Sequence, residues 1–148
     1  NGDPPHKTDK IITPAVHRLA MLQLAVEGIP YFRISDMEIR RKGYSYSSVT
    51  LEELKKAHPD TDYYFIMGAD SLFQIETWHE PAVIMADCVI LAAMRNHTPD
   101  DVFKKQMDYL EAKYHADIRF LNIPAKSGIV SGNISRFVLW FLRVFGNI

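Results

Sequence analysis

The sequence has 148 residues, of which 47% are hydrophobic and 24% are charged, and its formal net charge is −1. These values are typical of a globular domain with one hydrophobic core. They argue against nucleic acid as a partner, because no excess of basic residues could hold a phosphate backbone.

The single cysteine and the apolar segments argue against a secreted or membrane protein. Cys88 lies within an apolar run with no His or Cys at zinc-like spacing, so we expect a core residue in a reducing, cytoplasmic compartment. The most apolar segment, residues 137–145, is interrupted by Arg143 and is much shorter than the roughly 20 residues that span a bilayer. We therefore expect no membrane partner.

The N-terminal part is predicted to contain a loop followed by a helix. Two prolines place the first seven residues in a loop, where Lys7 is a potential phosphate donor. Thr13 is expected to cap the helix, with Pro14 at its first position and Gly28 beyond its end. Its apolar face would consist of Ala15, Leu19, Leu22 and Val26.

Two further elements are predicted before residue 60. Residues 31–39 are rich in β-forming side chains and indicate one or two short strands. A hydroxyl-rich segment then leads into a helix, in which Thr50 and Glu53 fit a capping box and Pro59 marks the end. The buried face of this helix would consist of Leu51, Leu54 and Ala57.

The central feature is the apolar run 63–67, which stops at Gly68. Such a run is typical of a strand buried on both faces. Asp70 and Ser71 follow at the start of a helix, at the carboxyl end of a strand, where open α/β proteins bind ligands. Gly68 would admit a ligand and Asp70 could accept hydrogen bonds from a ribose. Equally, Asp70 or Ser71 could be no more than an N-cap.

Helices and strands continue to alternate after residue 75. Trp78 precedes a short helix and could either stack on an aromatic ligand or fill the core. Residues 88–93 predict a second buried strand, after which Arg95 stands at a strand end, as Asp70 does. A helix is predicted from Thr98, and residues 118–123 predict a third strand. The helix has an apolar stripe of Phe103, Met107, Leu110 and Tyr114.

The C-terminal part is predicted to contain a polar loop, residues 126–133, and an apolar helix, residues 134–145. The helix is apolar on more than one side, so it is either covered by another segment or is a surface through which copies of the chain form a homo-oligomer. The order of elements predicts an α/β fold: a mostly parallel sheet with helices on both faces.

Five motifs follow one another in register between residue 1 and about residue 95. They are Asn-x-x-Pro-Pro-His-Lys at 1–7, His-Arg-Leu-x-Met-Leu-x-Leu-Ala at 17–25, the Arg-Lys-Gly-x-Ser-Tyr segment and Thr-Leu within 41–51, Phe-Ile-x-Gly-x-Asp-Ser-Leu at 65–72, and Thr-Trp at 77–78. Together they resemble the bacterial nicotinate mononucleotide adenylyltransferases of the nucleotidyltransferase α/β superfamily. The resemblance implies a Rossmann-like fold.

The resemblance also implies a reaction in NAD biosynthesis. AMP would pass from ATP to nicotinate mononucleotide, giving deamido-NAD and pyrophosphate, with Mg²⁺ on the phosphates. Trp78 would stack on the pyridine ring, Lys7 would lie near the phosphates, and Gly68 with Asp70 would line the adenosine side. The substrate-binding residues implied are Lys7, Ser45, Tyr46, Ser47, Trp78 and Arg95, and the ATP-binding residues implied are Gly68, Asp70 and Ser131.

Two departures from the family pattern qualify this expectation. The catalytic signature Gly-Gly-x-Phe-x-Pro-x-His-x-Gly-His is absent from the sequence, so no catalytic residue and no metal ligand is identified. The family's closing Ile-Ser-x-Thr-x-Ile-Arg is matched only loosely by residues 129–136, where Ser131 is kept. We therefore expect one nucleotidyltransferase-like domain over residues 1–148, without its first strand and divergent from about residue 129, with weak or no turnover.

Two alternatives stay open. One is another member of the superfamily, such as a phosphopantetheine or glycerol-phosphate nucleotidyltransferase, although Trp78 with Ser45 and Tyr46 favours a pyridine nucleotide. The other is a degenerate or truncated, non-catalytic nucleotide-binding domain that associates through its apolar tail.

Overall fold

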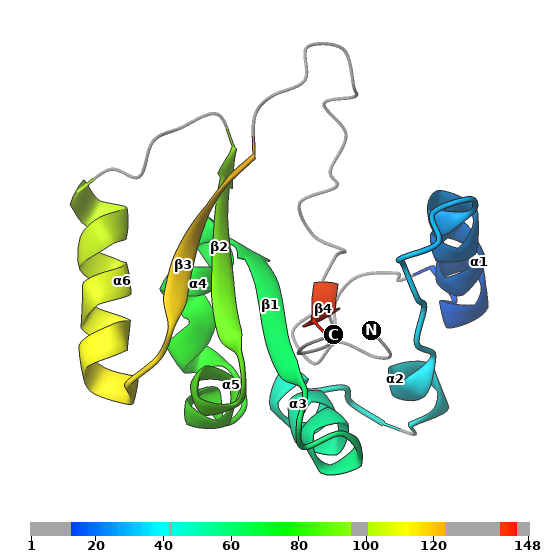
Figure 1. Ribbon diagram of the computed structural model, residues 1–148, viewed down its shortest axis with the longest axis horizontal. Coiled ribbons are helices and arrows are strands. Elements are labelled where there is room, and N and C mark those ends of the chain that lie inside the picture. Colours follow the sequence, from blue (N-terminus) through cyan, green and yellow to red (C-terminus); the bar gives the residue numbers. More distant parts are fainter. Residues whose placement is uncertain (1–12, 42, 96–100, 124–139, 145–148) are drawn as a thin grey trace. The chain divides into compact units, whose positions relative to one another are not determined.

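The computed structural model describes residues 13–41, 43–95, 101–123 and 140–144 (Figure 1). The chain divides into two compact units, Asn1–Tyr46 and Ser47–Ile148. The first unit contains two described helices, α1 (Ala15–Val26) and α2 (Met37–Arg40). The second unit contains the sheet.

Helix α1 begins one residue later than expected. Pro14 has ψ 142°, which is not helical, and it takes the N-cap position without a side-chain hydrogen bond, so the prediction of Thr13 as the N-cap is wrong. The predicted end is confirmed, because α1 stops at Val26 and Gly28 has φ +77°, a conformation that favours glycine. The predicted apolar face is half-buried, whereas Leu24 on another face is 72% exposed.

The predicted strand at residues 31–39 is wrong, because its second half forms α2. The carbonyl of Asp36 accepts hydrogen bonds from the N–H groups of Ile39 and Arg40, at 2.9 and 3.0 Å. The Ser35 hydroxyl accepts one from the N–H of Met37 at 3.3 Å. The Ser35 hydroxyl satisfies one of the first backbone donors of α2, and the backbone carbonyl of Asp36 accepts the first helical bonds. Here these local bonds override the β propensity of the side chains.

The second unit is a four-stranded sheet with helices, in the order β3-β2-β1-β4. β1 pairs with β2 and β2 with β3 in parallel, which confirms the predicted α/β, Rossmann-like fold with a mostly parallel sheet. The elements are α3 (Ser47–Ala57), β1 (Asp62–Gly68), α4 (Ala69–Gln74), the 3₁₀ helix η1 (Ile75–Thr77), α5 (Pro81–Asp87), β2 (Val89–Arg95), α6 (Asp101–Tyr114), β3 (Ile118–Ile123) and β4 (Trp140–Val144).

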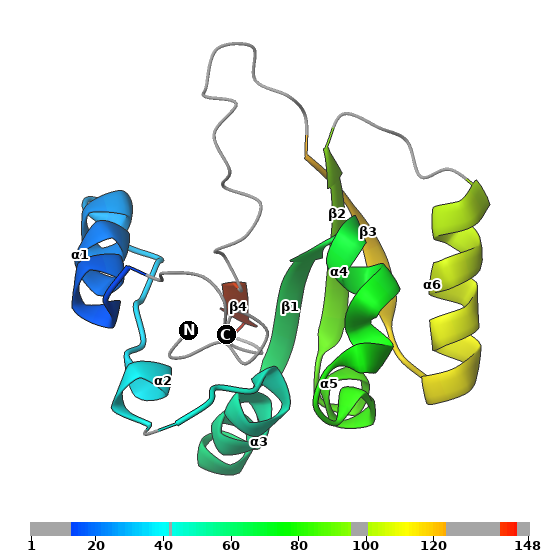
Figure 2. The ribbon, with the colours of Figure 1, turned by 180° about the vertical axis from the view of Figure 1, so that it is seen from behind.

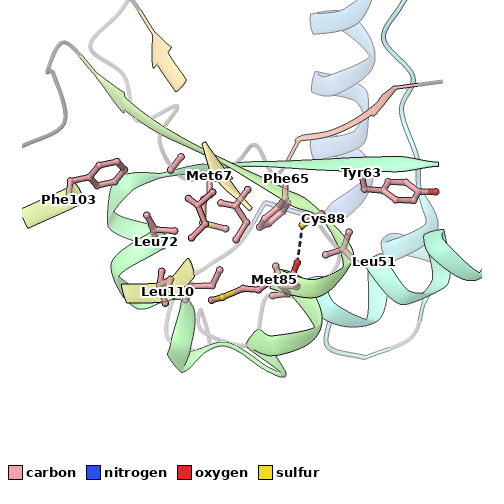
Figure 3. Packing of buried hydrophobic residues seen from close by; sticks show 14 residues of the cluster. Leu51, Tyr63, Phe65, Met67, Leu72, Met85, Cys88, Phe103 and Leu110 are labelled. Atoms are coloured by element: carbon pink, nitrogen blue, oxygen red, sulfur yellow. Dashed lines mark hydrogen bonds between the residues drawn. The ribbon is translucent and has the colours of Figure 1, made fainter. Parts of the chain in front are cut away.

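The core lies between one face of the sheet and helices α3 to α6 (Figures 2 and 3). Along β1, Tyr63, Phe65 and Met67 are buried, while the alternate residues Tyr64 and Ile66 are half-buried. The prediction that β1 is buried on both faces is therefore wrong for the second face, and helices on that face stay a prediction. The other strands and the helices contribute Leu51, Leu72, Ile75, Ile84, Met85, Cys88, Ile90, Ala92, Phe103, Leu110 and Ile118 to this core.

Two predicted helix starts are wrong. α3 begins at Ser47, so Thr50 lies inside the helix and is 2% exposed instead of capping it. α4 has Gly68 as its N-cap, without a side-chain hydrogen bond, so neither Asp70 nor Ser71 is the cap. In α3, Leu51 is fully buried and Leu54 packs on the core, but Ala57 is exposed, contrary to the prediction.

The apolar tail is a strand where the structure describes it. β4 pairs antiparallel with β1, from Asp62 opposite Val144 to Ile66 opposite Trp140. The helix predicted for residues 134–145 is wrong at 140–144, because pairing there satisfies backbone groups at the edge of β1 that a helix would leave open. Residues 134–139 and 145 lie outside the described residues.

Three further predictions for this unit are confirmed, namely α6, β3 and the burial of Cys88. Phe103 and Leu110 of α6 are 1% and 0% exposed. The predicted helix start at Thr98 and the polar loop predicted at 126–133 lie outside the described residues. Cys88 is buried, and its Sγ–H donates a hydrogen bond to the Ile84 carbonyl at 3.0 Å (Figure 3). Among the described residues no helix is long and apolar enough to cross a bilayer.

Candidate functional site

Three predicted site residues meet at the carboxyl edge of the parallel strands. β1 ends at Gly68 and β2 at Arg95, and Gly68 lies opposite Ala93 in the register. Asp70 follows in the first turn of α4 and is exposed. The structure describes only the backbone of Arg95. This edge is where open parallel sheets bind ligands.

Gly68 leaves open space at this edge. Its φ of −76° and ψ of 157° are extended values that any residue adopts. A Cβ added here would meet no described heavy atom within 4 Å. Neither backbone conformation nor packing among the described residues therefore requires a glycine.

Trp78 is half-buried and belongs partly to the core. Its ring meets Phe65 edge to face, with 6.2 Å between ring centroids and an interplanar angle of 79°. The backbone N–H of Trp78 donates to the Ile75 carbonyl at 3.0 Å, and Ile75 is fully buried. Phe65 precedes Gly68 by three residues, so the indole packs beside the middle of β1, about 10 Å along the strand from its end. The prediction that Trp78 fills the core is therefore confirmed in part, and its stacking on an aromatic ligand stays a prediction.

The residue two positions before Trp78 is held by α6. Glu76 Oε1 accepts hydrogen bonds from Lys113 Nζ at 2.6 Å, the Tyr114 hydroxyl at 2.9 Å and the Tyr109 hydroxyl at 3.3 Å. Lys113 and then Tyr114 hold the pKa of Glu76 below its ordinary value. The same contact with Glu76 raises the pKa of Lys113. Lys113 also lies over the rings of Tyr109 and Tyr114.

The residue after Trp78 contacts α3. His79 Nδ1 is 3.2 Å from the Ser48 hydroxyl and 3.2 Å from Glu80 Oε2. Ser48 is fully buried and follows Ser47, the first residue of α3. Sequence reasoning missed these contacts because the partners lie 31 to 38 residues apart, and the only local signal was adjacency to Trp78.

The other predicted site residues are not brought to this edge by described contacts. Ser45 and Tyr46 belong to the first unit, where the Ser45 hydroxyl donates to the Glu38 carbonyl at 3.3 Å and the Tyr46 ring lies 6.5 Å from that of Tyr44. Ser47 opens the second unit and is half-buried. Lys7 and Ser131 lie outside the described residues.

A cavity lies at the opposite end of the sheet. It has a volume of about 210 Å³ and is lined in part by Asp62, Val89 and Asp117, which stand at the amino ends of their strands. Within the described ranges, no group of three or more His, Cys, Asp and Glu residues is placed to hold a metal ion.

Comparison with known proteins identifies the family. The model of the cytidylyltransferase-like family matches residues 1–131. A probable nicotinate-nucleotide adenylyltransferase of Lachnoclostridium phytofermentans is 44% identical over 108 residues, 73% of this chain and 54% of the relative. Proteins of the same description from Clostridium novyi and Symbiobacterium thermophilum are each 36% identical, over 84% and 92% of this chain and 62% and 65% of their own length. The chain thus spans roughly half to two thirds of these relatives.

Solved structures show the same fold. A Plasmodium falciparum nicotinic acid mononucleotide adenylyltransferase complexed with NaAD matches with a TM-score of 0.55 and 22% identity, over 82% of this chain and 58% of that one. A structure of the P. falciparum enzyme complexed with APC matches with a TM-score of 0.56 and 18% identity, over 78% and 56%. With the family match over residues 1–131, this likeness leads to one conclusion: the chain belongs to the cytidylyltransferase-like family.

Proposed function

We propose that this chain carries the nucleotide-binding part of a nicotinate mononucleotide adenylyltransferase. Such an enzyme transfers AMP from ATP to nicotinate mononucleotide, and the products are deamido-NAD and pyrophosphate. The observation that carries the proposal is the meeting of Gly68, Asp70 and the end of β2 at one edge of a parallel sheet. The names of the relatives support this choice of substrates.

Adenylyl transfer requires the protein mainly to position the two substrates. A phosphate oxygen of nicotinate mononucleotide attacks the α-phosphorus of ATP, a new P–O bond forms, and the bond to pyrophosphate breaks. Because no protein group becomes covalently attached, rate enhancement comes from alignment and from cations or N–H donors where negative charge gathers. The open space at Gly68 suits adenosine, and the exposed Asp70 carboxylate suits ribose hydroxyls.

Mg²⁺ would come with ATP. This ion is usually held by substrate phosphates, and here it would be bound by the phosphates of ATP. When bound, Mg²⁺ supplies positive charge to the triphosphate and to the leaving pyrophosphate.

The acceptor would lie against Trp78. The accessible part of a half-buried indole, held by Phe65, offers a flat surface for the pyridine ring. Ser45, Tyr46 and Ser47 would assist there. Three further residues would contact the phosphates: Lys7, Arg95 and Ser131.

Competition binding tests the choice of acceptor. Nicotinate mononucleotide, phosphopantetheine and glycerol 3-phosphate are titrated into the chain by calorimetry, with and without an unhydrolysable ATP analogue. We expect nicotinate mononucleotide to bind most tightly. Tighter binding of either other acceptor would refute the proposal.

A further inference from the structure

Residues on both sides of Trp78 are held by different helices. Glu76 contacts α6, and His79 contacts α3. Trp78 itself has a ring contact with Phe65 and a backbone hydrogen bond to Ile75. The orientation of the indole therefore depends on how well the turn 75–80 is fixed.

The contact with α6 is unusually complete for a surface carboxylate. One oxygen of Glu76 receives three donors, and Lys113 Nζ also donates to the Tyr109 hydroxyl at 2.9 Å. Single exposed ion pairs stabilise a fold little, but a network that shares one acceptor fixes the geometry of the groups it joins. Its effect on the turn is local, because Glu76 belongs to η1, which leads directly into Trp78.

The contact with α3 fixes the other side of the turn. Ser48 is fully buried and His79 is exposed, so their hydrogen bond is shielded from water on the Ser48 side only. Glu80 has φ 47° and ψ 60°, a left-handed conformation that costs free energy for a residue other than glycine. His79, the residue before it, contacts both Ser48 and Glu80 through Nδ1.

We propose that Glu76 and His79 are positioning residues, which orient Trp78 for a flat heteroaromatic ring of the acceptor. The inference rests on the proposed function, because it assigns the ring to Trp78. Neither residue touches the ring in this account. Each acts through the turn, so its loss weakens binding of nicotinate mononucleotide and leaves ATP binding unchanged.

The test measures the orientation of the Trp78 ring and the affinity for nicotinate mononucleotide in two separate experiments. The chain has two tryptophans, so 5-fluorotryptophan labelling gives two ¹⁹F signals, and Trp78→Phe assigns them. Glu76→Ala and His79→Ala are expected to shift or broaden the Trp78 signal and to weaken nicotinate mononucleotide binding about fivefold, the effect of one net hydrogen bond. Glu76→Gln keeps an acceptor at the same place, and His79→Asn keeps a side chain that can donate or accept there, so both are expected to restore much of the affinity.

The matched control is Asp117→Ala. Asp117 forms an exposed pair with Arg119, in which Oδ2 is 2.6 Å from Nη2, with no described contact to the turn. This change should leave the Trp78 signal and both affinities unaltered. The inference is overturned if Glu76→Ala and His79→Ala behave like the control. If the unsubstituted chain binds no nicotinate mononucleotide, the proposed function fails, while the Trp78 signal still decides whether these residues hold the turn.

Discussion

At the scale of single residues, burial decides the chemistry of Cys88. The side chain is 8% exposed, and burial raises the pKa of its thiol to about 12 from an ordinary 9. A raised pKa means that the neutral thiol stabilises the fold fully below pH 9, and that this contribution is lost as the pH rises through about 12. The sequence predicted this residue correctly, because a lone Cys in an apolar run has few other roles.

Cys88 is therefore expected to resist modification in the folded chain. At pH 8 a pKa of about 12 leaves roughly one thiol in ten thousand ionised, and the thiolate is the reactive form. Labelling with a disulfide reagent at pH 8 should be far slower for the folded chain than for the chain in denaturant. Equal rates in the two conditions would contradict the burial of this side chain.

At the scale of elements, periodic apolar patterns were predicted well and local hydrogen bonding was not. α6 follows from its apolar stripe, whose spacing identifies the buried side, and β3 forms at the predicted residues 118–123. Residues 31–39 and 140–144 were assigned to the wrong element, because each has side chains compatible with helix or strand. Bonds from Ser35 and Asp36 decide the first, and pairing with β1 decides the second.

The stripe of α6 gives a stability test. Leu110 is fully buried, whereas Val102 on the same helix is 64% exposed. Leu110→Ala should lower the free energy of unfolding by about 2–5 kcal/mol, because it removes buried methyl groups and leaves a cavity. Val102→Ala is the control and should change it by less than about 0.5 kcal/mol. Chemical denaturation measures both, and similar losses would show that α6 packs differently.

At the scale of the whole molecule, the sequence predicted the fold class and three residues that share the carboxyl edge of the sheet. Gly68, Asp70 and the end of β2 come together because the carboxyl ends of parallel strands lie at the same edge of a sheet. The alternation of helices and strands along the sequence already implies such a parallel sheet. The contacts of Glu76 and His79 on either side of Trp78 could not be predicted. Glu76 and Lys113, for example, are 37 residues apart, and their contact depends on tertiary packing. Burial of part of the indole follows from its packing on Phe65.

The central claim is that one chain binds two nucleotides, the acceptor ring at Trp78 and adenosine at Gly68. A crossed titration tests it most directly, with ATP and nicotinate mononucleotide each measured on Trp78→Leu and Gly68→Ala. Leucine keeps apolar bulk but loses the flat ring, and alanine suits the φ of −76° and meets no described atom, so both chains should fold. We predict that Trp78→Leu weakens only nicotinate mononucleotide, by about tenfold for roughly 1.4 kcal/mol of lost stacking, and that Gly68→Ala weakens only ATP. Equal losses of both ligands in either variant, or no loss in both, would contradict the account.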